Sequence, residues 1–222
     1  LIALAPASVQ EMADFVGLAF DLAFKYRNPA IILADGVIGQ MMEKVVLPEQ
    51  RPRLTNEEVM ARCPWATFGK LKHRGPNIVT SLELDPAEME KRNIHLQQKY
   101  AEIEEKEVRY EEIHCDDAEY LIVAFGSCAR IAQKAMEEAR AEGIKVGLLR
   151  PITLWPFPSK AIAERSRQVK GILTVELNAG QMVEDVRLAV ACKVPVEHFG
   201  RLGGIVPDPD EVITCLLYTS PS

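Results

Sequence analysis

Acidic and amide side chains stand where apolar segments of this chain end. Asp35 follows the apolar run Ala30–Ala34, and Glu176 lies near the end of a second run, Gly171–Leu177, with Gln181 shortly after it. Because open parallel sheets bind ligands outside the carboxyl ends of their strands, these three residues are candidates for a binding site. Asp35 also fits a turn-forming residue whose carboxylate accepts from nearby backbone N–H groups, and this alternative stays open.

Arg150 and two aromatic residues follow another apolar segment. The string PITLWPFP comes directly after Arg150 and carries Trp155 and Phe157 among its three prolines. A loop fixed by proline has little conformational entropy left to lose on binding, so these residues are candidates for a subunit interface. We expect at least one aromatic to be partly exposed, beside Glu176 and Gln181. A core position for Trp155 is the alternative.

No set of residues in the sequence indicates a particular catalytic reaction. The sequence contains no Ser-His-Asp pattern, no P-loop and no cluster of metal ligands. A phosphate could bind at Gly126-Ser127 if a helix begins there, whereas Gly200–Gly204 is more typical of a turn. The cysteines are scattered without a Cys-x-x-Cys pair, which favours reduced thiols in a cytoplasmic protein over disulfides, zinc or an iron–sulfur cluster. They are Cys63, Cys115, Cys128, Cys192 and Cys215. We therefore predict no catalytic residue and no metal site.

The elements that position these side chains centre on residues 120–155. Apolar runs at Tyr120–Phe125 and Ile144–Leu149 indicate two strands buried on both faces. Between them, apolar residues recur at helical spacing from Ala129, with Ser127 as the expected N-cap and Gly143 as the left-handed residue that closes the helix. A crossover of this length makes the two strands parallel neighbours. The segments downstream repeat the pattern, which predicts an α/β fold.

Two helices are expected before this unit. Ser8 and Glu11 have the spacing of a capping box, which predicts a helix that runs to about Tyr26. A highly charged segment from Pro86 to about Glu111 predicts a long connecting helix with a narrow apolar stripe.

The two ends of the chain are unusual. Leu1–Leu4 resembles the tail of a strand, so we interpret the chain as a fragment that begins inside a domain. A closing helix is expected to start at Asp210 and to be lost after Ile213. Residues 214–222 show no amphipathic pattern, and foreign sequence would explain this atypical tail.

Composition excludes two classes of partner. The 222 residues carry a net charge of −6, and no stretch concentrates Lys and Arg with aromatics, which argues against nucleic acid. No apolar run approaches the roughly 20 residues that cross a bilayer, so no membrane partner is expected.

Four segments carry a family resemblance: LAPASVQEMADFVGLAFDLAFKYRNPAIILADGVIGQM, EVRYEE, GLLRPITLWPFPSKAI and VELNAGQMVEDVRLAV. They resemble the alpha subunit of 2-oxoacid:ferredoxin oxidoreductases, most closely the branched-chain type. The resemblance covers residues 1 to about 213. It implies that residues 1–50 are the end of a thiamine-diphosphate pyrimidine-binding domain and that 51–117 are a linker with a long helix. Residues 118–213 then form a parallel-sheet domain similar to the transketolase C-terminal domain.

The resemblance also implies a reaction. A 2-oxoacid, here 3-methyl-2-oxobutanoate, would be oxidatively decarboxylated to acyl-CoA with reduction of ferredoxin, using thiamine diphosphate with Mg²⁺ and iron–sulfur clusters in partner subunits. The family's catalytic residues lie upstream of the matching segments, so this chain alone is expected to be inactive and to bind none of these cofactors. The alternatives are a 2-oxoglutarate enzyme, a non-catalytic transketolase-type assembly domain, and a small nucleotide-binding protein.

Overall fold

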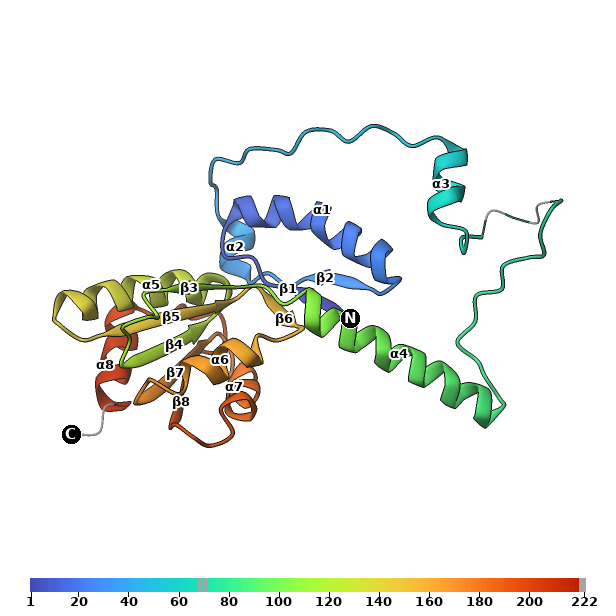
Figure 1. Cartoon of the computed structure of the whole chain (residues 1–222). Coiled ribbons are helices and arrows are strands. Elements are labelled where there is room, and N and C mark those ends of the chain that lie inside the picture. The colour runs from blue at the N-terminus through green and yellow to red at the C-terminus, as the bar shows by residue number, and fades with distance from the viewer. Residues whose placement is uncertain (68, 70–71, 220–222) are drawn as a thin grey trace. The chain divides into compact units, whose positions relative to one another are not determined.

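The chain forms two compact units, one of Leu1–Leu47 with Ala101–Ser222 and one of Pro48–Tyr100. The computed structural model describes residues 1–67, 69 and 72–219. Figure 1 shows the elements along the chain. In order they are β1 (Ile2–Leu4), α1 (Val9–Tyr26), β2 (Ala30–Ile32), α2 (Gly36–Gln40), α3 (Asn56–Arg62), α4 (Pro86–Lys106), β3 (Tyr110–Ile113), β4 (Tyr120–Ala124), α5 (Gly126–Ala141), β5 (Val146–Pro151), β6 (Thr153–Trp155), α6 (Ser159–Arg165), β7 (Gly171–Glu176), α7 (Met182–Val190), β8 (Val196–Gly200) and α8 (Pro209–Thr219).

The larger sheet has five strands in the order β3-β5-β4-β7-β8. β4 pairs in parallel with both β5 and β7, and β7 pairs in parallel with β8, which confirms the α/β fold and the β4-α5-β5 unit. The edge strand β3 runs antiparallel to β5. The sheet is therefore mixed, and its parallel part consists of β5, β4, β7 and β8.

Two hydrophobic cores cover the two faces of this sheet. Alternate residues of β4 point to opposite faces, so Ile122 packs in the core with α5 and α8, while Leu121 and Val123 pack with α6 and α7. Figure 1 shows α5 on one side of the strands and α6 and α7 on the other. Because both faces are buried, every residue of β4, β5 and β7 is buried, which is why these strands read as continuous apolar runs.

A smaller sheet of order β2-β1-β6 belongs to the same unit. β1 pairs in parallel with β2 and antiparallel with β6. The apolar run Ala30–Ala34 does contain a strand, β2, but this strand is a sheet edge rather than buried, and Ile31 is 38% exposed. The PITLWPFP string, expected to be a crossover loop, contains the strand β6.

Two expected helix ends were wrong. α4 stops at Lys106, and Tyr110–Ile113 form β3, an edge strand whose two glutamates resemble the charges of a solvated helix face. The closing helix α8 does not break after Ile213 but continues to Thr219, because Val212 and Leu216 both enter the core beside α5. Residues 220–222 of the expected tail lie outside the described residues, and the origin of the tail stays a prediction.

Gly143 closes α5 as predicted, with a φ of +89° directly after the last residues of the helix. A side chain with Cβ is strained in this region, although no atom lies within 4 Å of a Cβ placed there. We expect Gly143→Val to lower the free energy of unfolding by about 1–2 kcal/mol in urea denaturation. Gly147→Ala is not a suitable control because its Cβ would meet backbone at 3.0 Å. Gly75→Ala is a better control, because Gly75 lies outside the left-handed region and no atom lies within 4 Å of a Cβ placed there, so it should change the free energy of unfolding by less than about 0.5 kcal/mol.

Glu107 joins the end of α1 to the segment that follows α4. Its buried carboxylate accepts from Lys25 Nζ at 2.6 Å, from the Tyr26 hydroxyl at 2.6 Å and from Arg109 Nη1 at 3.0 Å. Burial alone would raise the pKa of Glu107, but these three donors outweigh it and lower the pKa from 4.5 to about 2.

In the unit of Pro48–Tyr100, Thr55 and Glu58 form a capping box that begins α3.

The depressed pKa of Glu107 predicts a pH dependence of stability. A carboxylate with a lower pKa in the folded state stabilises the fold fully above its unfolded pKa of 4.5 and loses that contribution as the pH falls toward about 2. We expect Glu107→Gln to lower the free energy of unfolding by about 2 kcal/mol at pH 7, and the difference from wild type to shrink below pH 4.5. Urea denaturation of both proteins at several pH values between 7 and 3 measures this difference in the free energy of unfolding. A difference that does not change with pH would contradict the assignment.

Candidate functional site

The predicted site residues lie in several different places. Arg150 lines a charged pocket, and Asp35 lies at the start of α2 and α5. Trp155 and Phe157 line a separate groove, while Glu176 contacts the first turn of α7. The contacts of the described residues therefore do not gather them into one site.

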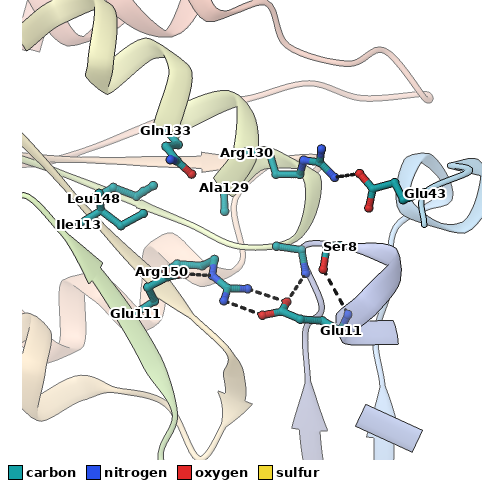
Figure 2. Close-up of a pocket in the computed structure, with 11 residues that line it drawn as sticks. Ser8, Glu11, Glu43, Glu111, Ile113, Ala129, Arg130, Gln133, Leu148 and Arg150 are labelled. Carbon is teal, nitrogen blue, oxygen red and sulfur yellow. Dashed lines mark hydrogen bonds and ion pairs between the residues drawn. The ribbon is translucent and has the colours of Figure 1, made fainter. Parts of the chain in front are cut away.

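The charged pocket has a volume of about 250 Å³ and lies where α1, α5, β3 and β5 meet. Figure 2 shows the guanidinium of Arg150 facing the carboxylate of Glu11, with the Arg130–Glu43 pair apart from them. The pocket is lined by Ala7, Ser8, Glu11, Glu43, Glu111, Ile113, Ala129, Arg130, Gln133, Leu148 and Arg150.

Arg150 pairs with two of the three carboxylates in this pocket. Its side chain is 9% exposed, and its two terminal nitrogens donate to the two oxygens of Glu11 at 2.8 Å each. The Nε atom donates to Glu111 at 2.9 Å. Glu11 comes from the first turn of α1 and Glu111 from β3, so one guanidinium from β5 ties three elements together.

The capping box predicted at Ser8 is formed only in part. The hydroxyl of Ser8 accepts from the Glu11 N–H at 3.1 Å, as expected. The carboxylate of Glu11 accepts from the Ala7 N–H at 2.7 Å rather than from Ser8, and turns to Arg150. Burial would raise the pKa of Glu11, but the hydrogen bonds from Arg150 and Ala7 outweigh it, so the pKa lies below its ordinary value.

Arg130 is paired as well. Its guanidinium donates to Glu43 at 2.7 Å, and this bond, with one from the Val9 N–H, lowers the pKa of Glu43. The pocket therefore holds three carboxylates and two guanidiniums, and each guanidinium is already paired with a carboxylate. A diphosphate would have to displace these carboxylates and would be repelled by them, so the pocket residues do not fit thiamine diphosphate. Their chemistry suits the positioning of elements rather than catalysis.

Asp35 joins the first turns of two helices. Its Oδ1 accepts from Val37 and Ile38 at the start of α2, at 3.0 and 2.9 Å, so the turn-forming alternative was right. Its Oδ2 accepts from the Ser127 N–H of α5 at 2.8 Å. The predicted N-cap at Ser127 was wrong, because α5 already begins at Gly126 and is capped from 92 positions earlier in the sequence. A phosphate at Gly126-Ser127 is disfavoured, because the carboxylate already occupies the start of the helix.

Glu176 is 1% exposed, and its carboxylate caps the start of α7, as that of Asp35 caps α2 and α5. Its carboxylate accepts from the backbone N–H groups of Gln181, Met182 and Val183 at 3.3, 2.8 and 3.0 Å. It also lies 3.5 Å from His198 Nδ1. Gln181 contributes its backbone here, and α7 has no side-chain cap of its own. Glu176 does stand at the end of β7, but its carboxylate accepts from the start of α7 rather than facing an open ligand site.

Trp155 and Phe157 are both half-buried, as expected for at least one of them. They line a groove with Tyr110 and residues at the end of α4. The expectation that Glu176 and Gln181 lie beside them was wrong for this groove, because neither lines it. Trp155 belongs to β6 of the smaller sheet, whereas Glu176 ends β7 of the larger one.

Two of the buried cysteines, Cys115 and Cys128, are poor nucleophiles. Burial raises the pKa of the Cys115 thiol to about 11 and that of Cys128 to about 12, so both are protonated at neutral pH. Within the part of the chain that the structure describes, no three His, Cys, Asp or Glu residues are grouped so that they could hold a metal ion. None of the described helices has the combination of length and apolar character that a membrane crossing requires.

Comparison with known families decides the identity of the chain. Residues 1–113 match the thiamine-diphosphate-binding domain of pyruvate flavodoxin/ferredoxin oxidoreductase, and residues 118–212 match core domain II of pyruvate:ferredoxin oxidoreductase. This chain belongs to the pyruvate flavodoxin/ferredoxin oxidoreductase family. The division of the chain into 1–50, 51–117 and 118–213 stays a prediction.

Relatives within the oxidoreductase family extend the match. The ketoisovalerate oxidoreductase subunit VorB of Methanothermobacter thermautotrophicus is 50% identical over 90% of this chain and 55% of its own length. The 2-oxoglutarate synthase subunit KorA of Methanothermobacter marburgensis is 30% identical over 98% of this chain and 63% of its own length. This oxidoreductase chain thus spans a little over half the length of the relatives it matches.

A solved structure shares the fold. The 2-oxoglutarate:ferredoxin oxidoreductase from Magnetococcus marinus aligns with a TM-score of 0.74 at 21% identity, over 98% of this chain and 42% of that one. At this identity the likeness concerns the fold alone. The family resemblance seen in the four sequence segments is confirmed.

Sequence reasoning missed the partners that make the charged pocket. Glu11 was assigned only to a helix cap, and Glu111 was placed in a helix rather than in β3. The one available signal was the position of Arg150 at the end of a buried strand, where a charged side chain requires a partner.

Proposed function

We propose that this chain is part of the alpha subunit of a 2-oxoacid:ferredoxin oxidoreductase that acts on 3-methyl-2-oxobutanoate. The observation that carries the proposal is the 50% identity to a ketoisovalerate oxidoreductase subunit, against 30% to a 2-oxoglutarate synthase subunit, over nearly the whole chain. The reaction is oxidative decarboxylation to an acyl-CoA with reduction of ferredoxin. A 2-oxoglutarate enzyme remains the second candidate.

The residues of this chain position elements in that enzyme. Arg150, Glu11 and Glu111 hold α1 against β3 and β5, and Asp35 holds the starts of α2 and α5 together. We place the residues that bind thiamine diphosphate, Mg²⁺ and the iron–sulfur clusters elsewhere in the full subunit and its partner subunits. The five free cysteines support a reducing, cytoplasmic location for the complex.

The reaction class is tested on the assembled complex. The full-length subunit, taken from the complete reading frame, is purified with its partner subunits and supplied with 3-methyl-2-oxobutanoate, coenzyme A and oxidised ferredoxin. The proposal predicts ferredoxin reduction that depends on both the 2-oxoacid and coenzyme A. Reduction that proceeds without coenzyme A, or no reduction with any 2-oxoacid, would contradict it.

The chain by itself is predicted not to retain thiamine diphosphate. The charged pocket carries more carboxylates than guanidiniums, and every guanidinium in it is paired. Isothermal titration calorimetry of the 222-residue chain with thiamine diphosphate and Mg²⁺ should show no heat of binding at micromolar concentrations. A dissociation constant in the micromolar range would overturn the prediction, whether or not the complex is active.

A further inference from the structure

A groove of about 520 Å³ lies between the end of α4, β3, β6 and the start of α6. Three aromatic side chains line it: Tyr110, Trp155 and Phe157. Tyr110 is 43% exposed, and the other two are half-buried. The remaining lining residues are Glu104, Glu105, Val108, Pro158, Ser159, Lys160 and Ala161. We call this feature the acidic–aromatic groove.

Two contacts fix the strand that carries Trp155 in the floor of the acidic–aromatic groove. Trp155 belongs to β6, where it stands opposite Ala3 of β1. Two residues earlier, the Thr153 hydroxyl accepts from the Arg109 N–H at 2.9 Å, which fixes β6 against the segment that leads to Tyr110. The aromatic surface is therefore formed before any partner binds, so little entropy remains to be lost on docking.

The charge at the rim of the groove is unbalanced. Glu104 and Glu105 are exposed, and the described residues offer them no ion pair or hydrogen bond. The neighbouring carboxylates differ, since Glu102 accepts from Lys106 and Glu107 accepts from Lys25. Lys160, from α6, is the single cation among the lining residues, so the groove has a net negative charge.

We propose that the acidic–aromatic groove docks a basic segment of another subunit of the oxidoreductase complex. An arginine or lysine of that segment lies over the rings of Trp155 and Phe157 and pairs with Glu104 and Glu105. A cation is attracted to the face of an aromatic ring as well as to a carboxylate, so aromatic rings beside unpaired glutamates form a surface complementary to a basic side chain. The inference rests on the proposed function only in taking the partner to be a subunit of that complex.

The test measures association of the full-length subunit with its purified partner subunits as a function of salt. Glu104→Gln with Glu105→Gln should weaken association about 10-fold at low salt and reduce its salt dependence. The control, Glu142→Gln with Glu164→Gln, makes the same charge change at exposed positions outside the groove and should leave the affinity unchanged. Both pairs lie on the surface, so neither is expected to unfold the protein.

The aromatic floor is tested in the same assay. Trp155→Ala should weaken association about 30-fold, as is typical of a buried interface aromatic. Trp155 can also be followed by its fluorescence, as the difference in emission between the wild-type subunit and a Trp155→Phe variant. This difference should shift to shorter wavelength when the partner subunits bind, and millimolar tetra-arginine amide should compete with them better than tetra-citrulline amide.

Three outcomes would overturn the inference. They are equal affinity of the Glu104/Glu105 variant and wild type, unchanged Trp155 emission on assembly, and self-association of the subunit with the same salt dependence, which would make a second copy the occupant. The readout does not require turnover. A complex that assembles through the groove but oxidises no 2-oxoacid would therefore reject the proposed function and leave this inference standing.

Discussion

Replacement of Arg150 by methionine is expected to lower the free energy of unfolding by about 3–5 kcal/mol. Methionine keeps the apolar length of the side chain, but it leaves Glu11 and Glu111 without the guanidinium that pairs with both. Removal of one partner from a largely buried ion pair leaves an uncompensated charge, which costs more than the pair contributed. Burial by itself would lower the pKa of Arg150, yet hydrogen bonds and charge from the two glutamates outweigh it and raise the pKa.

Urea denaturation followed by circular dichroism measures this loss. Lys170→Met is the matched control, because Lys170 forms an ion pair with Glu119 that is 59% and 43% exposed on its two sides. An exposed pair is worth about 0–1 kcal/mol, so the control should unfold almost as wild type does. Equal midpoints for Arg150→Met and Lys170→Met would contradict the role given to the charged pocket.

Replacement of Asp35 by alanine is expected to lower the free energy of unfolding by about 2–4 kcal/mol. The carboxylate accepts two N–H groups of α2 and one of α5, and its negative charge lies at the positive ends of both helices. Asp85→Ala is the matched control, because Asp85 caps α4 alone through Ala87 and Glu88, and its loss should cost about 1 kcal/mol.

Gly126→Ala tests the same contact from the other side. Gly126 has a φ of +61°, and a Cβ there would lie 2.7 Å from Asp35 Oδ2. The alanine should therefore push the carboxylate away from the Ser127 N–H and destabilise the fold by an amount similar to Asp35→Ala. The double variant should be less destabilised than the sum of the two, because both changes break the same hydrogen bond. Additive losses would show that Asp35 does not cap α5.

The sequence predicts the centre of this fold well because its strands are buried on both faces. β4 and β5 appear as short apolar runs, and the helix between them shows its period and its closing Gly143. The edge strand β3 was missed since it is short and carries two glutamates, so it looks like the end of the charged helix before it. β6 was missed because it is short and lies among prolines.

The candidate site was less predictable, because its contacts join residues far apart in the sequence. Arg150 and Glu11 are separated by 139 positions, and Asp35 and Ser127 by 92. Local patterns correctly identified Asp35 as a turn former and Glu176 as a strand-end residue. They carry no information about which distant backbone N–H or guanidinium each carboxylate meets.

Steady-state kinetics of the reconstituted complex test the identity of its substrate most directly. The complex with the full-length subunit is assayed for ferredoxin reduction with 3-methyl-2-oxobutanoate, 2-oxoglutarate and pyruvate in turn. We expect kcat/KM for 3-methyl-2-oxobutanoate to exceed the other two by about 10-fold or more, because a pocket that fits a branched apolar chain disfavours both an added carboxylate and a shorter chain. A higher kcat/KM for 2-oxoglutarate would contradict the claim and assign the chain to the other candidate.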